Sequence, residues 1–161
     1  MNKPQIILSM PSLRGGEWEA FLEPYDGALD WVRVDLPLFL QCGDGLLDGL
    51  RERGLKILLD AKLLDQPRVV AATVCALSRK PVDMITLHAL GGPEMLRAAA
   101  EARANRAPEL KLITSTMLPH MDREQVNRVG IPGEVAGQNL RLAQMGALHD
   151  IDGTLCAAED L

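Results

Sequence analysis

The chain has 161 residues, of which 47% are apolar and 24% are charged, and its formal net charge is −5. This length and composition predict one globular domain over residues 1–161, with an aliphatic core because only 3% of residues are aromatic. The net negative charge and the lack of a basic cluster argue against nucleic-acid binding. No apolar stretch is long enough to cross a membrane.

The three cysteines indicate the cellular compartment. Cys42, Cys75 and Cys156 are far apart and odd in number, which is typical of reduced thiols rather than of a disulfide framework or a metal site. The N-terminus also lacks the basic segment and long apolar run of a signal peptide. We therefore expect a cytoplasmic protein.

Short apolar segments alternate with helical segments along the chain. Strands are predicted at 6–10, 31–36, 56–62, 84–88, 112–116 and 153–156, and helices at 17–22, 44–53, 67–78, from 93 onward, at 122–126 and at 133–145. Pro37 is interpreted as the end of the second strand, and Gly91 and Gly92 as a loop. The first five strands begin near residues 6, 32, 57, 84 and 112, which gives spacings of 26, 25, 27 and 28.

This near-constant spacing predicts a repeated strand–helix unit and hence a parallel sheet. A closed barrel of eight such units needs roughly 250 residues. We therefore expect an α/β fold: an incomplete TIM-type (β/α) barrel of about six parallel strands with surrounding helices.

Three charged residues follow the third apolar segment at a fixed spacing. Asp60 and Lys62 are two positions apart, so they share one face of a strand, and Asp65 lies in the turn before a helix that Pro67 begins. Catalytic groups of (β/α) barrels lie at this carboxyl end of the strands. A surface salt bridge where the strand exits is the alternative interpretation.

The residues Asp60, Lys62 and Asp65 match the D-x-K-x-x-D motif, and the chain here resembles the orotidine 5′-phosphate decarboxylase family. Three more segments resemble that family in the expected order: V-R-V-D-L-P-L-F at 32–39, T-L-H-A with a following G-G at 86–92, and D-G-T-L-C-A-A-E at 152–159. The resemblance covers nearly the whole chain.

The resemblance implies decarboxylation of a nucleotide monophosphate without a metal or another cofactor. In the family, the lysine matching Lys62 protonates the carbanion, the aspartate matching Asp60 lies near the substrate carboxylate, and the aspartate matching Asp65 belongs to a site completed across a dimer interface. Arg33, His88 and Thr114 are the expected substrate-binding residues. A lysine between two carboxylates stays charged, because nearby negative charge favours its ionised form.

Several positions depart from the family pattern. Pro11 stands where the family has an aspartate, Arg33 where it has a lysine, and Leu118 where it has a serine that contacts the base. Arginine keeps the charge but is larger and planar, so the replacement changes a tight site. The chain is also expected to lack strands seven and eight, which carry the family's phosphate-binding loops, so an impaired enzyme is expected.

These departures leave other functions open. One is a non-catalytic homologue that binds a nucleotide or another protein, and another is the metal-dependent sugar-phosphate branch of the same superfamily, which has a glutamate where this chain has Arg33. Arg33 is equally well placed for a local ion pair with Asp35, and His88 for a structural hydrogen bond. Because six strands would leave two free edges, we also expect a homodimer or larger assembly that covers the open barrel.

Overall fold

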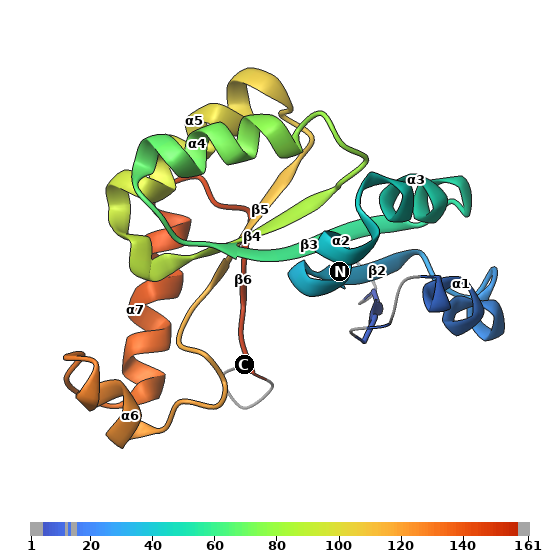
Figure 1. Cartoon of the computed structure of the whole chain (residues 1–161). Helices are drawn as coiled ribbons and strands as arrows, with labels where there is room; N and C mark the ends of the chain where they lie inside the picture. The colour runs from blue at the N-terminus through green and yellow to red at the C-terminus, as the bar shows by residue number, and fades with distance from the viewer. Residues whose placement is uncertain (1–4, 12, 14–15, 158–161) are drawn as a thin grey trace.

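The computed structural model describes residues 5–11, 13 and 16–157, and its central feature is one six-stranded parallel sheet that curls into a half-barrel (Figure 1). The strands are β1 (Ile7–Ser9), β2 (Trp31–Asp35), β3 (Lys56–Leu63), β4 (Met84–His88), β5 (Lys111–Ser115) and β6 (Gly153–Leu155). Each strand pairs with the next strand of the chain, which is the strand order of a (β/α) barrel. The predicted fold class is confirmed.

Helices connect the strands and surround the sheet. They are α1 (Glu17–Leu22), α2 (Leu36–Cys42), α3 (Asp44–Glu52), α4 (Pro67–Leu77), α5 (Gly92–Arg106), α6 (Arg123–Arg128) and α7 (Val135–Ala147), with short 3-10 turns at Glu23–Tyr25 and Ala89–Gly91. Helices α4 and α5 pack side by side, and α7 crosses the end of the sheet near β6 (Figure 1). None of the helices that the structure describes is both long and apolar enough to span a bilayer.

Helix α2 was not predicted from the sequence, because Pro37 was interpreted only as the end of β2. Asp35 instead caps a helix: its Oδ1 accepts the backbone N–H of Leu38 at 2.9 Å. Pro37 lies in the first turn, where a missing N–H leaves no helical hydrogen bond unmade. An aspartate followed two positions later by proline, as in Asp35 and Pro37, is a typical start of a helix.

The core lies between the outer face of the sheet and the helices. Strand side chains alternate between faces, and the outward positions are large aliphatic residues with almost no solvent exposure. They include Val32, Val34, Ile57, Leu59, Ile85, Leu87 and Leu112. The inward face instead carries Arg33, Asp60, Thr86 and His88, as the register of neighbouring strands shows. The sheet therefore separates an apolar outer core from a polar inner face.

Candidate functional site

The polar inner face is organised around one buried carboxylate, that of Asp60. Its Oδ2 accepts hydrogen bonds from the guanidinium of Arg33, with Nε at 2.8 Å, and from the Lys62 ammonium at 2.5 Å. Its Oδ1 accepts the hydroxyl of Thr86 at 2.8 Å. The Asp60 side chain is only 1% exposed, whereas those of Arg33 and Lys62 are 38% and 33% exposed. The carboxylate therefore holds two cations whose outer surfaces face solvent.

A bulge at the end of β3 brings Lys62 to this position. Leu59 pairs with Ile85 and Leu63 pairs with Leu87, so four steps along β3 lie beside two steps along β4. Lys62 has a φ of 44°, in the left-handed region that costs a residue with a Cβ about 1 kcal/mol or more. Its N–H donates to Thr86 Oγ1 at 2.8 Å, which fixes the bulge. Such strain is concentrated at functional sites.

Two opposed effects act on the Asp60 carboxyl group. Burial raises its pKa, while the hydrogen bonds from Lys62, Thr86 and Arg33, together with the charge of Arg33, lower it, and the net result is a pKa below the usual value. Asp60 is therefore ionised at neutral pH. The group acts as a fixed negative charge that orients Lys62, because a carboxylate in this state only accepts hydrogen bonds.

His88 ends β4 on the same inner face and is buried. Burial, and to a lesser degree the charge of Lys62, lower the pKa of His88. The neutral ring accepts the N–H of Leu90 at Nδ1, at 3.3 Å. This hydrogen bond holds the turn that follows β4, and the role of His88 in ligand binding stays a prediction.

Asp65 and Thr114 lie apart from this cluster. Asp65 is exposed, and its Oδ1 accepts the N–H of Gln66 at 2.6 Å. Thr114 is on the outer face, where its hydroxyl lies 3.0 Å from that of Thr154. A Cβ added to Gly146 of α7 would lie 3.0 Å from Thr114 Oγ1, so the helix packs directly on this side chain. Their proposed roles in catalysis and substrate binding stay predictions.

A pocket of about 620 Å³ opens beside the cations, at the C-terminal ends of the strands. Arg33 and Lys62 line one part of it, together with the hydroxyl-bearing Ser115 and Thr116. The rest of the lining is mostly apolar and comes from the segment after β5, the N-terminal half of α7 and the end of β6, including Met117, Leu118, Met121, Val135 and Leu155. Its volume is within the usual range for a small-molecule site.

Sequence reasoning missed two residues of this inner face. Thr86 bridges Asp60 and the backbone of Lys62, and Ser115 lines the pocket. The signal was the period-two alternation itself: Thr86 is two positions before His88, and Ser115 is the register partner of His88. In the ranges that the structure describes, no group of three or more His, Cys, Asp or Glu side chains is placed to hold a metal ion.

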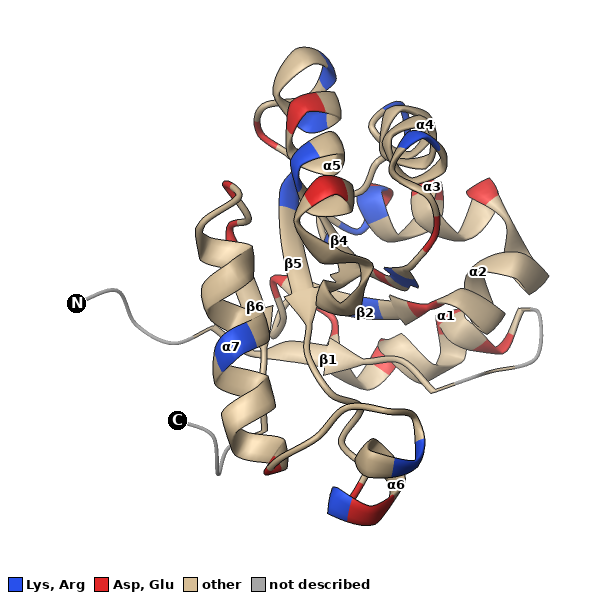
Figure 2. Cartoon of the chain, turned by 90° about the vertical axis from the view of Figure 1, so that its left-hand side faces the viewer, with Lys and Arg blue, Asp and Glu red and all other residues tan. Residues whose placement is uncertain are grey.

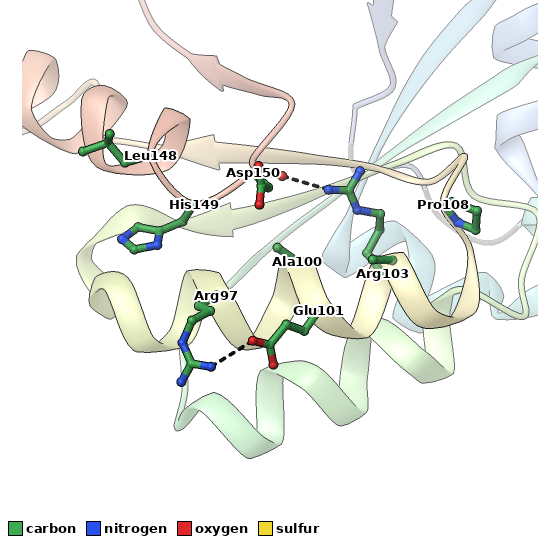
Figure 3. A pocket seen from close by; sticks show the side chains of 9 residues that line it. Arg97, Ala100, Glu101, Arg103, Pro108, Leu148, His149 and Asp150 are labelled. Carbon is green, nitrogen blue, oxygen red and sulfur yellow. Dashed lines mark hydrogen bonds and ion pairs between the residues drawn. The ribbon is translucent and has the colours of Figure 1, made fainter.

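A second pocket of about 620 Å³ lies at the opposite, N-terminal ends of β5 and β6, between α5 and the loop that follows α7 (Figure 3). Both arginines that line it have hydrogen-bond partners. Arg97 Nη1 binds Glu101 Oε1 at 2.8 Å, and Arg103 Nη2 donates to the backbone carbonyl of Asp150 at 2.8 Å. This end of a barrel usually contributes to stability rather than chemistry, so we place the candidate site at the Lys62 pocket.

Comparisons with known proteins agree with the (β/α) barrel architecture. The family model described as "Orotidine 5′-phosphate decarboxylase / HUMPS family" matches residues 4–161. Orotidine 5′-phosphate decarboxylases of Opitutus terrae and Alcanivorax borkumensis are 32% and 34% identical over 94% and 96% of this chain. The chain spans 65% and 67% of the length of these two relatives.

Solved structures show the same architecture. An uncharacterized conserved protein from Geobacillus kaustophilus has a TM-score of 0.90 and 28% identity, over 96% of this chain and 74% of that one. Orotidine 5′-phosphate decarboxylase from Lactobacillus acidophilus has a TM-score of 0.86 and 27% identity, over 96% of this chain and 72% of that one. With the family match over almost every residue, these likenesses show that the chain belongs to the orotidine 5′-phosphate decarboxylase / HUMPS family.

Proposed function

We propose that the chain is an orotidine 5′-phosphate decarboxylase-type carboxy-lyase, which converts orotidine 5′-phosphate to uridine 5′-phosphate and carbon dioxide in pyrimidine biosynthesis. The observation that carries the proposal is the Lys62 ammonium, held 2.5 Å from a buried, ionised Asp60 beside an open pocket. Family membership supports the same activity.

The chemistry follows from these groups. The bond between the ring carbon and the carboxylate breaks, the electron pair stays on the ring carbon, and carbon dioxide leaves. The Lys62 ammonium then donates a proton to that carbon and recovers one from solvent. Because Asp60 and Thr86 hold the lysine before the reaction, little reorganisation is needed as charge develops.

Arg33 is the reason to expect a slow enzyme. Its guanidinium shares Oδ2 of Asp60 with Lys62, so much of the negative charge beside the reacting carboxylate is neutralised. The same contact favours the second candidate function, a non-catalytic homologue that binds a nucleotide or another protein, because such a protein needs a stable cluster rather than a reactive one.

Turnover separates the two functions. We would follow orotidine 5′-phosphate by ultraviolet absorbance at high enzyme concentration, with wild-type protein and Lys62→Ala. The lyase proposal expects slow turnover that is lost in the variant. Equal absorbance traces for the two proteins would reject it in favour of the binding function. Added magnesium is included in a parallel reaction, because stimulation would point to the metal-dependent branch.

We also propose that the working form is a homodimer or larger assembly. β1 and β6 are the edges of the described sheet, and the rim at the C-terminal strand ends exposes Leu40 and Leu64, at 73% and 54%. Asp65 is exposed on the same rim, next to Leu64. Light scattering would give a dimeric mass that falls to the monomer in Leu64→Glu, whereas a monomeric wild-type protein would overturn the proposal.

Cytoplasmic localisation belongs to the same proposal. Cys42, Cys75 and Cys156 are all free thiols, which suits a reducing compartment. Fractionation of cells that express the chain would place it with cytoplasmic markers. Recovery with the membrane fraction or outside the cell would contradict this localisation.

A further inference from the structure

The described sheet is open on both sides. β1 and β6 each pair with one neighbouring strand, and they do not pair with each other (Figure 1). A free strand edge presents backbone N–H and C=O groups to which a further strand can bind, and neither described edge strand carries a proline or a charged residue that would oppose such pairing. Because each edge strand has only 3 residues, a neighbouring surface has to contribute to binding.

Helix α7, which lies beside β6, provides such a surface. One side of this helix and its C-cap carries exposed, uncharged residues at helical spacing, which we call the α7 face: Gly137, Leu140, Gln144, Ala147 and Leu148. Leu140 and Leu148 are 61% and 81% exposed. The only charged residue of α7 is Arg141 (Figure 2). The exposed side of α7 is therefore apolar next to a free strand edge.

Helix α5 shows how a helix of the same chain is adapted to solvent. On its exposed side, Arg97 forms ion pairs with Glu94 and Glu101, three and four positions away. No ion pair within α7 can play this part, because α7 has a single charged residue. Exposed apolar patches beside polar surface are typical of interaction sites. The α7 face is suited to packing against another helix, as α4 packs against α5.

The inner face of the sheet also lacks full cover. Below the charged cluster it is apolar, and Met84 and Ile113 are half-buried while Ile7 is 37% exposed. Trp31 lies two positions before Arg33 and so on this same face. Its indole Nε1 is buried and has no hydrogen-bond acceptor among the described residues. Buried donors of this kind normally have a partner, and an element that fills the interior would supply one.

The matched relatives indicate the size of that element. The chain spans 65% and 67% of the length of the Opitutus terrae and Alcanivorax borkumensis enzymes. The unmatched third of each is long enough for two strand–helix units of 25 to 28 residues, the spacing of the strands in this chain. Eight strands close a (β/α) barrel, so two further units would join β6 to β1.

We propose that the open side of the half-barrel binds a partner polypeptide of two strand–helix units. Its first strand pairs in parallel with β6, its first helix packs an apolar side on the α7 face, and its second strand pairs with β1. The α7 face is separate from the rim of Leu40 and Leu64, so this partner and a second copy of the chain have different docking surfaces. This partner goes beyond the proposed reaction, because no step of that reaction is used to identify it.

A binding experiment tests the partner directly. The probe is the segment of the Opitutus terrae enzyme that follows the part matched by this chain, fused to a soluble carrier protein. Size-exclusion chromatography with light scattering should give a one-to-one complex with this chain, whereas the carrier alone should give none. Absence of a complex with the fused segment would overturn the proposal.

A matched pair of variants tests the place of binding. Leu140→Glu should weaken the complex at least about tenfold in biolayer interferometry, because it buries a charge against an apolar helix. Val129→Glu replaces an apolar residue that is also 61% exposed but lies outside the α7 face, and it should leave the affinity unchanged. Far-ultraviolet circular dichroism checks that both variants are folded. Equal weakening by the two variants, or none, would overturn the placement on α7.

Hydrogen exchange tests the strand pairing. Backbone amides of residues 153–155 in β6 should exchange at least about tenfold more slowly in the complex, while those of the central strand β3 should not change. Unchanged exchange at β6 would contradict the pairing. If the chain instead forms a dimer that Leu140→Glu dissociates and does not bind the segment, the α7 face binds a second copy and the proposal fails.

These measurements use no substrate, so they fail independently of the proposed reaction. Binding of the segment by a chain that does not turn over orotidine 5′-phosphate would reject the lyase and retain the partner. Turnover by the chain without binding of the segment would retain the lyase and reject the partner.

Discussion

Two pockets of the same size, about 620 Å³ each, lie at opposite ends of one sheet. In the pocket at the N-terminal strand ends, Arg97 binds Glu101 and Arg103 binds the Asp150 carbonyl (Figure 3). Arg103 also pairs with the carboxylate of Asp152. In the pocket at the C-terminal strand ends, two cations share a single buried carboxylate. Volume does not distinguish a site from a surface hollow here, whereas incompletely neutralised charge does.

The inner and outer faces of the sheet explain this difference. The outer face is filled by aliphatic side chains, so it needs no polar partner. The inner face holds the Asp60 carboxylate, which would be costly to bury without partners. Lys62, Thr86 and Arg33 all donate hydrogen bonds to it. The cluster is stable only as a set, and its cations are the members that reach the pocket.

The largest expected effect comes from changing the proton donor while keeping its charge. Lys62→Arg retains a cation that does not release its proton near neutral pH, so turnover of orotidine 5′-phosphate should fall by about 10²–10⁴-fold. Arg97→Lys in the other pocket is the control and should leave turnover unchanged. Full turnover by Lys62→Arg would exclude Lys62 as the donor.

The next effect is on stability. Thr86→Val removes the hydroxyl that donates to Asp60 and accepts from the Lys62 N–H, so the free energy of unfolding should fall by about 1–3 kcal/mol. Thr73 is half-buried on α4 and its hydroxyl bonds only to its own helix, so Thr73→Val should change the unfolding free energy by less than about 0.5 kcal/mol. Urea titrations with equal losses for both variants would show that the inner-face network is not stabilising.

A smaller effect tests how α7 positions the pocket wall. Gly146→Ala places a methyl group 3.0 Å from the hydroxyl of buried Thr114, and we expect a loss of about 1 kcal/mol in unfolding free energy. Gly137, on the same helix, has nothing within 4 Å of an added Cβ, so Gly137→Ala should stabilise by up to about 1 kcal/mol. Thermal unfolding checks both. Stabilisation by Gly146→Ala would contradict the close packing of α7 on β5.

The smallest effect is a pH dependence. The pKa of His88 is lowered by burial and by Lys62, so below about pH 6.5 the unfolded chain binds a proton that the folded chain resists. Stability should therefore decline as pH falls through this window, down to the lowered pKa. His88→Asn should reduce the slope, and the exposed His120→Asn is the matched control. An unchanged slope in His88→Asn would argue against the buried neutral ring.

Most of the fold was predictable because its strands are apolar, short and evenly spaced. Asp60 and Lys62 do lie together as the sequence predicted, although a bulge rather than regular strand alternation brings them into contact. Helix α2 was missed because proline was interpreted as an end rather than as a first-turn residue. The helix cap at Asp35 would have identified it.

The rest of the site depended on relations that one segment does not contain. Arg33 pairs with Asp60 across 27 positions of sequence. Because Asp35 is only two positions from Arg33, the sequence gave no reason to prefer Asp60 as the partner of Arg33. The bulge at Lys62 has no signature in the strand pattern, because a residue with a Cβ occupies a left-handed conformation. The face on which Thr114 lies follows only from the register of β4 and β5. That register pairs Ser115, rather than Thr114, with His88 of the inner face.

The most direct test of the charge argument is a map of where an anionic ligand binds. Amide spectra of isotope-labelled protein would be recorded during titration with orotidine 5′-phosphate. The account predicts that the largest shifts occur at Lys62 and residues 115–121. Largest shifts at residues 100–104 and 148–150, around the neutralised pocket, or no shifts at all, would contradict it.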